Sequence, residues 1–264
     1  MITIQNYARV QSLDEAYELN QKKGNKILGG MLWLKTCNAT INTAIDLSDL
    51  GLDKITETDE EFIIGAMTSL RSLELHEDLN TFSQNAVMNG VKDIVGVQFR
   101  NMATVGGSLY GRYGFSDVLT VFLMMDSYVK LHNAGIIPLS EYVKQDYDRD
   151  ILVELIVKKT PGRFIYNAMR NQRTDFPVIT CATSIIDGNV RAVIGARPDR
   201  AIVINDDEKI LANGLNKEAI EKFAGYVADN AKTGSNTRGS AEYRKHLINV
   251  LTTRNLLEAG GQND

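Results

Sequence analysis

Two pairs of adjacent glycines, each directly after a short apolar run, place the strongest constraint on how this chain can fold. They lie at 29–30 in KILGGMLW and at 106–107 in NMATVGGS. Glycine reaches positive φ without the steric cost of a Cβ atom, so a strand that ends on such a pair can enter a tight turn. Backbone N–H groups in such a turn can point into one concavity that favours an anion, and a diphosphate fits that description.

Glycine pairs alone are a weak signal. A chain of this length and glycine content should contain about two pairs by chance, and three are present, the third at 260–261. Neither the dinucleotide fingerprint G-x-G-x-x-G nor the P-loop GxxxxGK[ST] occurs at either loop. Neighbouring residues must therefore show whether the loops bind a ligand.

The composition limits the classes of partner. With 44% hydrophobic and 23% charged residues, the chain can bury one or two sizeable cores. Its net charge of −4 provides no basic surface for nucleic acid or an anionic membrane. The first residues lack a signal-peptide pattern, and no run approaches the roughly 20 apolar residues of a membrane span. We expect a cytoplasmic protein whose partners are small molecules or other proteins.

Metal-binding side chains are few and scattered. Cys37 and Cys181 lie far apart and cannot form a disulfide framework, and the usual iron–sulfur cluster needs four thiolates. The three histidines have neither an i,i+4 partner nor a nearby cysteine. We expect no metal site on this chain, so any iron–sulfur cluster that works with it would be on another chain.

The order of segments predicts an α+β fold in which helices cover a meander of strands. Ser12 and Glu15 occupy the capping-box positions of a first helix that should end at Gly24. A second helix is expected over 68–79, with Thr68 as its cap.

The second half of the chain begins at a breaker. Pro161-Gly162 interrupts either kind of element and marks the best candidate for a domain boundary. Asp187-Gly188 predicts a hairpin turn, and two helices, over about 216–230 and 240–258, are expected to close the chain. The predicted strands are NKILGG, AIDLSDL, EFIIGAM, YVKLHN, DILVELIV, RFIYNAM, FPVITCATSII and VRAVIGAR.

A polar and aromatic segment, SLYGRYGFSD, follows the second glycine pair and ends in its only carboxylate, Asp117. The residues alone favour a helix N-cap, a role open to Ser116 or Asp117, before an apolar helix over 118–126. A carboxylate at this point could also accept hydrogen bonds from the hydroxyl groups of a sugar or a ribityl chain.

Several segments together resemble the flavin-binding subunit of molybdenum hydroxylases, the family of the xanthine, nicotinate and carbon monoxide dehydrogenase FAD subunits. The resemblance spans nearly the whole chain, and the RN-x-AT-[VI]-GG stretch contributes most to it. It implies a PCMH-type FAD-binding domain over 1–160, with two α/β subdomains at about 1–55 and 56–160. A C-terminal antiparallel sheet covered by helices would follow over 161–264. The segments are KILGGMLWL, RNMATVGGSLYGRYGFSDVLTVFLMMD, DILVELIV, YNAMRNQRTDFPV and GSAEYRKHLINVLTTR.

The resemblance also implies which residues contact FAD. In the family the two glycine loops hold the diphosphate mainly through backbone amides, and an acid ten residues after the second pair binds hydroxyls of the cofactor, which here is Asp117. Leu152 stands where the family places an aliphatic residue beside the flavin, although the sequence alone makes it strand core. Tyr166 either stacks on the isoalloxazine or is an ordinary aromatic on a strand face. The loop residues are Lys26, Ile27, Leu28, Gly29, Gly30, Met31 and Leu32 in the first loop, and Thr104, Val105, Gly106, Gly107 and Ser108 in the second.

The chain departs from the family pattern in three places. Met31-Leu32 replaces a Thr-Asp pair, and Ser108 replaces an asparagine. A lysine common near the start of the third domain is missing, and Ile165 or Asn167 stands there depending on the placement of one gap. Because the changed groups are side chains, we expect FAD binding to be weakened or its potential altered, not abolished.

The implied function is an FAD-binding electron-transfer subunit that passes electrons between iron–sulfur clusters and NAD, with no catalytic acid or base of its own. The FAD would be non-covalent, and the molybdenum cofactor and the 2Fe–2S clusters would lie on partner subunits of a hetero-oligomer. Two cysteines are too few for the usual all-cysteine cluster, which agrees with that division. Two alternatives stay open: a flavin-less structural or assembly subunit, and a free-standing flavin reductase.

Overall fold

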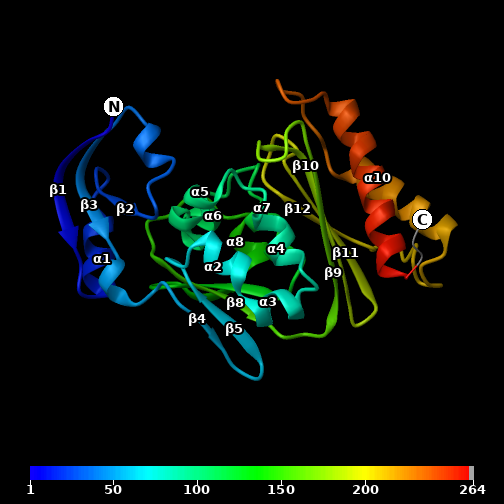
Figure 1. Ribbon diagram of the computed structural model, residues 1–264, viewed down its shortest axis with the longest axis horizontal. Coiled ribbons are helices and arrows are strands. Elements are labelled where there is room, and N and C mark those ends of the chain that lie inside the picture. The colour runs from blue at the N-terminus through cyan, green and yellow to red at the C-terminus, as the bar shows by residue number, and fades with distance from the viewer. Residues whose placement is uncertain (262–264) are drawn as a thin grey trace. The chain divides into compact units, whose positions relative to one another are not determined.

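The computed structural model describes residues 1–261 and divides the chain into two compact units, each built from three stretches of sequence (Figure 1). The first unit comprises Met1–Ser72, Val97–Gly111 and Ser127–Lys158. The second comprises Leu73–Gly96, Arg112–Asp126 and the chain from Lys159 onward. The domain boundary between 160 and 161 stays a prediction.

A small parallel sheet forms one part of the first unit. Its strand order is β1 (Thr3–Arg9), β3 (Thr40–Asp46), β2 (Lys26–Leu28). Helix α1 (Leu13–Asn20) connects β1 to β2, and its predicted start is confirmed, because Ser12 Oγ accepts a hydrogen bond from the Glu15 amide at 3.1 Å. The helix ends at Asn20, before the predicted Gly24, and side-chain hydrogen bonds described below hold that end.

A five-stranded antiparallel sheet forms the rest of the first unit. Its order is β4 (Ile55–Glu57), β5 (Glu61–Gly65), β8 (Leu152–Lys158), β6 (Ser127–Leu131), β7 (Gly135–Pro138). Short helices accompany it: α5 (Val97–Met102), α6 (Val105–Tyr110), α8 (Leu139–Tyr142) and the 3-10 turns η1 (Leu34–Thr36) and η2 (Ser48–Leu50). One core cluster joins α1, β3 and the start of β8: Val10, Ala16, Ile45, Leu47, Leu52, Ile151 and Val153.

The second unit contains the predicted antiparallel meander. The order is β12 (Ile202–Asn205), β11 (Asn189–Gly195), β10 (Pro177–Ile186), β9 (Gly162–Arg170), of which β12 was not predicted. The hairpin at Asp187-Gly188 is confirmed, since both residues have positive φ, 49° and 76°, as a type I′ turn requires.

Helices cover this sheet, as predicted, and they do so on both faces (Figure 1). Adjacent residues of β10 point to opposite faces. Thr180 Oγ1 lies 3.0 Å from Thr120 Oγ1 of α7 (Asp117–Leu123), whereas Cys181 Sγ lies 3.5 Å from Thr252 Oγ1 of α10 (Ala241–Ala259). The remaining helices of this unit are α3 (Glu77–Phe82), α4 (Ala86–Val91) and α9 (Lys217–Asn230).

The single helix predicted over 68–79 is wrong. The chain forms α2 (Leu70–Leu75) and α3, separated at His76, whose Nδ1 caps the second helix by accepting from the Leu79 amide at 3.2 Å. Thr68 is not a cap, because its hydroxyl donates to the Lys54 carbonyl at 3.1 Å. Within residues 1–261, no helix combines the length and the apolar character needed to cross a membrane.

A buried arginine joins α10 to the sheet of the second unit. Arg244 has no exposed surface and donates to the Val178, Gly234 and Gly239 carbonyls at 2.8, 2.6 and 2.6 Å and to Asn236 Oδ1 at 2.6 Å. Burial lowers the pKa of this guanidinium from its ordinary value. One side chain therefore fixes the loop over 234–239 against β10.

Replacing Arg244 by methionine should lower the free energy of unfolding by about 3 kcal/mol, because four acceptors, one of them buried in β10, lose the donor of a fully buried side chain. Urea titration followed by circular dichroism measures this. The control is Lys245→Gln, which removes only an exposed ion pair to Asp229 and should cost less than about 0.5 kcal/mol. Equal losses in the two variants would contradict a structural role for Arg244.

Candidate cofactor site

The first unit contains a cavity of about 160 Å³ between the two glycine loops and the start of β8. Seven of the residues predicted to contact FAD line it: Lys26, Ile27, Gly29, Thr104, Gly106, Gly107 and Leu152. The structure thus brings together three segments that are far apart in the sequence. Three of the seven are glycines, which contribute only backbone to the cavity wall.

Two glycines keep this cavity open. A Cβ added to Gly29 would lie 3.1 Å from Thr104 Oγ1, and one added to Gly107 would lie 3.0 Å from the same oxygen. The added Cβ of Gly107 would also lie 3.7 Å from the Gly29 carbonyl oxygen, so the two loops approach each other at these positions. Any larger residue at either position would crowd Thr104 Oγ1 and force the two loops apart.

The first loop has the predicted left-handed turn. Gly30 has φ of 61°, and an added Cβ would lie 1.9 Å from the Met102 carbonyl oxygen, so only glycine fits. Met31 also has φ of 61°, and its amide donates to the Gly29 carbonyl at 2.6 Å. Leu28 belongs to β2, and neither it nor Gly30, Met31 or Leu32 lines the cavity.

The same expectation is wrong for the second loop. Gly106 and Gly107 lie in the first turn of α6 with no positive φ, and Thr104 caps that turn by accepting from the Gly107 amide at 3.1 Å. The amides of Val105 and Gly106 donate to carbonyls of residues 68 and 66 at 2.9 and 2.7 Å. Glycine is required at 106 for packing instead, because a Cβ would lie 2.7 Å from the carbonyl of residue 66.

The other two predicted residues of the second loop have local roles. Val105 is fully buried in the core. The hydroxyl of Ser108 donates to the Thr104 carbonyl at 2.9 Å within α6. Neither side chain lines the cavity.

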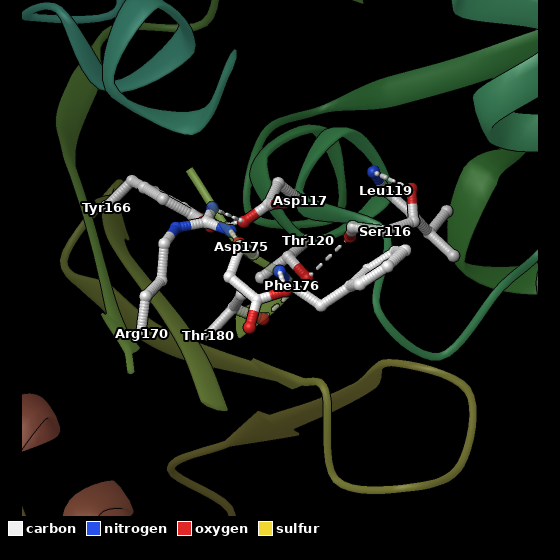
Figure 2. Close-up of polar contacts among 9 residues, drawn as sticks. All are labelled: Ser116, Asp117, Leu119, Thr120, Tyr166, Arg170, Asp175, Phe176 and Thr180. Atoms are coloured by element: carbon white, nitrogen blue, oxygen red, sulfur yellow. Dashed lines mark hydrogen bonds and ion pairs between the residues drawn. The ribbon is translucent and has the colours of Figure 1, made fainter. Parts of the chain in front are cut away.

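Asp117 lies in the second unit, at the first residue of α7. Ser116 is the N-cap, since its Oγ accepts from the Leu119 amide at 3.1 Å, so the cap interpretation of Asp117 is wrong. Asp117 is 4% exposed, and its Oδ1 accepts hydrogen bonds from the Tyr166 hydroxyl and, at 2.5 Å, from Arg170 Nη2. Figure 2 shows both side chains pointing toward this carboxylate from β9.

Burial sets the titration of this cluster. Desolvation raises the pKa of Asp117 to about 6, although the Arg170 charge and the hydrogen bonds from Tyr166 and Arg170 act to lower it. Burial and the adjacent carboxylate also raise the pKa of Tyr166 well above its usual value. The cluster therefore holds a neutral phenol and a carboxyl that changes charge near neutral pH.

Arg170 is a residue that the sequence reasoning missed. Besides its ion pair with Asp117, its Nη1 donates to the Asp175 carbonyl at 2.6 Å and so fixes the turn after β9 (Figure 2). Of the two residues proposed at the missing lysine position, Asn167 donates to Asn255 Oδ1 at 2.8 Å, and Ile165 pairs with Thr183 in the sheet. The available sequence signal for Arg170 was its position at the end of a predicted strand.

The missed cavity residues come mainly from two segments. Asn20 ends α1 and Asn25 follows it, and Arg149, Asp150 and Ile151 precede β8. The charged pair directly before an apolar strand was their only sequence signal. No cluster of three or more metal-binding side chains occurs in the described part of the chain.

These features define a class of protein: an α+β protein with a glycine-lined cavity in its first unit and a helix-covered antiparallel sheet in its second. Residues 3–159 match the family described as the FAD binding domain in molybdopterin dehydrogenase. Residues 164–259 match the CO dehydrogenase flavoprotein C-terminal domain. The chain belongs to this family of flavoproteins and is an FAD-binding oxidoreductase subunit of the molybdenum hydroxylase type.

Individual relatives are distant in sequence but similar over their full length. The chain is 24% identical to the xanthine dehydrogenase FAD-binding subunit of Escherichia coli O157:H7, covering 98% of this chain and 97% of that one. It is 24% identical to the carbon monoxide dehydrogenase medium chain of Afipia carboxidovorans, covering 94% of each. Carbon monoxide dehydrogenase from Hydrogenophaga pseudoflava has the same fold, with a TM-score of 0.88 at 20% identity and 98% coverage of each chain.

The raised pKa of Asp117 predicts a pH-dependent stability. Between about pH 4 and 6 the folded protein keeps a proton that the unfolded chain has released, so this contribution is complete below pH 4 and is lost as pH rises through 6. The stability of the natural chain minus that of Asp117→Asn should therefore fall by roughly 2 kcal/mol between pH 4 and 7. Denaturant titrations at several pH values measure it, and a flat or rising difference would contradict the raised pKa.

Proposed function

We propose that this chain binds FAD non-covalently and passes electrons between iron–sulfur clusters of a partner subunit and NAD. The observation that carries the proposal is the cavity of the first unit, which Gly29 and Gly107 line with backbone that has no Cβ atom. When bound, FAD supplies the redox chemistry, because it exchanges a hydride with nicotinamide and single electrons with clusters.

The cavity residues fit the phosphate part of FAD. Gly29 and Gly107 allow close approach of the diphosphate, and Lys26 brings a positive charge to the rim. Ile27 and Leu152 provide apolar wall, with Leu152 assigned to the flavin side. Thr104 holds the second loop through its cap.

The other assigned residues act through the shape of the loops. Gly30 and Met31 make the left-handed turn that brings the first loop past residue 102. Leu28, Leu32, Val105, Gly106 and Ser108 keep the two loops in place by strand pairing, packing and helix formation.

Asp117 and Tyr166 are proposed to serve the hydroxyls and the ring of FAD. Their own hydrogen bond constrains that role, because a cofactor hydroxyl must share a carboxylate that already accepts from Tyr166 and Arg170. Asp117 would then bind through its remaining acceptor capacity, and Tyr166 would present its ring while its hydroxyl stays on Asp117.

Partner subunits are proposed to supply the clusters and the molybdenum cofactor. Cys37 is exposed, whereas Cys181 is buried with a thiol pKa raised to about 12 by desolvation, so it is not available as a thiolate ligand. We propose an FAD-binding domain over 1–160, with subdomains at about 1–55 and 56–160, and a C-terminal domain over 161–264. The family matches, which meet between 159 and 164, support that boundary.

One observation favours a second candidate, a flavin-less assembly subunit. The first loop presents Met31 and Leu32 where the family pattern has a polar pair, and both are only partly buried. A visible flavin absorption spectrum on the purified complex separates the two functions, because a flavin-less subunit has none.

Replacing Gly107 by valine should raise the FAD dissociation constant at least about tenfold, since overpacking a closed site costs roughly 1–3 kcal/mol. The fold should remain, because Gly107 faces the cavity and a hydroxyl, unlike Gly106. Titration of FAD into the cofactor-free chain measures affinity, and circular dichroism measures folding. Gly225→Val is the control, a helical glycine whose nearest neighbour would be 3.9 Å away. Unchanged affinity in Gly107→Val would reject the diphosphate assignment.

Flavin bound to this chain should be reduced by the substrate that the complex hydroxylates only when the iron–sulfur and molybdenum subunits are both present. Too few available thiolates on this chain make a partner cluster necessary for that route. Rapid-mixing spectroscopy on the co-expressed three-subunit complex, compared with a preparation lacking the cluster subunit, tests this. Flavin reduction at an undiminished rate without the cluster subunit would contradict electron transfer through the clusters and favour the free-standing reductase.

A further inference from the structure

Five hydrogen bonds join the C-terminal end of α1 to a residue more than 120 positions later. The Arg149 side chain donates through Nε to the Asn20 carbonyl and through Nη2 to the Lys22 and Asn25 carbonyls at 2.7 and 3.1 Å. In return, the Asn20 and Gln21 side-chain amides donate to the Arg149 carbonyl at 2.7 and 3.1 Å. Each of the two segments thus donates hydrogen bonds to the other and also accepts hydrogen bonds from it.

The position of this cluster gives it a consequence for the cavity. Residues 26–30, the first glycine loop, begin directly after Asn25, and β8 begins three residues after Arg149 with Leu152. Asn20, Asn25, Lys26, Gly29, Arg149 and Leu152 all line the cavity. The hydrogen bonds therefore set the distance between two walls of the cavity. One wall is the segment that leads into the first glycine loop, and the other is the segment that leads into β8.

The chemistry of the cluster requires a guanidinium. The last carbonyls of a helix have no partner within the helix, and a cation at that end is favoured by the helix dipole. The planar guanidinium of Arg149 contacts three carbonyl groups at once. The single nitrogen of a lysine cannot reach all three. Two of its partners, Asn20 and Asn25, are themselves buried, with 6% and 2% exposed.

We propose that Arg149 is a positioning residue for FAD: it holds the first glycine loop against the start of β8 in the geometry that the cofactor needs. This inference rests on the proposed function, since it concerns the same cavity. Arg149 acts through residues 20–25 and the loop that follows them. Its guanidinium is committed to backbone carbonyls and is not assigned to the cofactor.

The test compares FAD affinity in Arg149→Gln, Arg149→Lys and the natural chain, measured by fluorescence titration at a temperature where circular dichroism shows each protein folded. Arg149→Gln should raise the dissociation constant at least about tenfold, and Arg149→Lys by a smaller factor. The control, Arg9→Gln, loses an exposed ion pair with Asp49 in the same unit and should stay within about twofold.

Each outcome of this comparison supports or overturns the positioning role of Arg149. A purely structural role lowers the melting temperature of Arg149→Gln but leaves the FAD affinity of the folded protein within twofold, and that result overturns the proposal. If Arg149→Gln does not fold, Arg149→Lys decides in the same way. Absence of FAD binding in both the natural chain and Arg9→Gln would reject the proposed function and with it the positioning role, a pattern distinct from failure of the Arg149 variants alone.

Discussion

The close approach of two backbone segments at Gly29 and Gly107 is the constraint on which the first unit depends. With no Cβ at either position, Thr104 Oγ1 can lie between the loops and the cavity beside them stays open. The two loops reach this arrangement by different backbone geometry. The first uses a left-handed turn at Gly30 and Met31, whereas the second is a helix start capped by Thr104. Family membership assigns FAD to the protein, and this cavity is where we propose its diphosphate binds.

Arginine side chains fix segments of the chain in both units. In the first unit, Arg149 fastens the end of α1. In the second, Arg244 fastens the loop over 234–239, and Arg170 joins the start of α7 to the turn after β9. A guanidinium suits this work because its planar fork donates to several carbonyls at once and satisfies groups that burial would otherwise leave unpaired. These side chains consequently act in folding and positioning, and none is needed as a catalytic acid or base.

Asp117 shows how burial changes the role of a side chain. A carboxylate before an apolar helix is ordinarily a cap, but Ser116 takes that role and Asp117 is buried with Tyr166 and Arg170. Desolvation brings its pKa to about 6. The charge of this cluster therefore depends on pH around 6, and the proposed binding of FAD through Asp117 is linked to that protonation.

The sequence by itself determined the family, the α+β class and most of the strands, because apolar periodicity, caps and breakers act over a few neighbouring residues, as at Ser12 and Asp187-Gly188. It also located seven cavity residues through the resemblance. Only the tertiary structure decided the rest. Gly106 and Gly107 are helical because their amides find acceptors at residues 66 and 104, and Arg149 matters because it meets carbonyls that lie more than 120 residues away. Local patterns cannot specify such contacts, since they depend on which distant segments the folded core brings together.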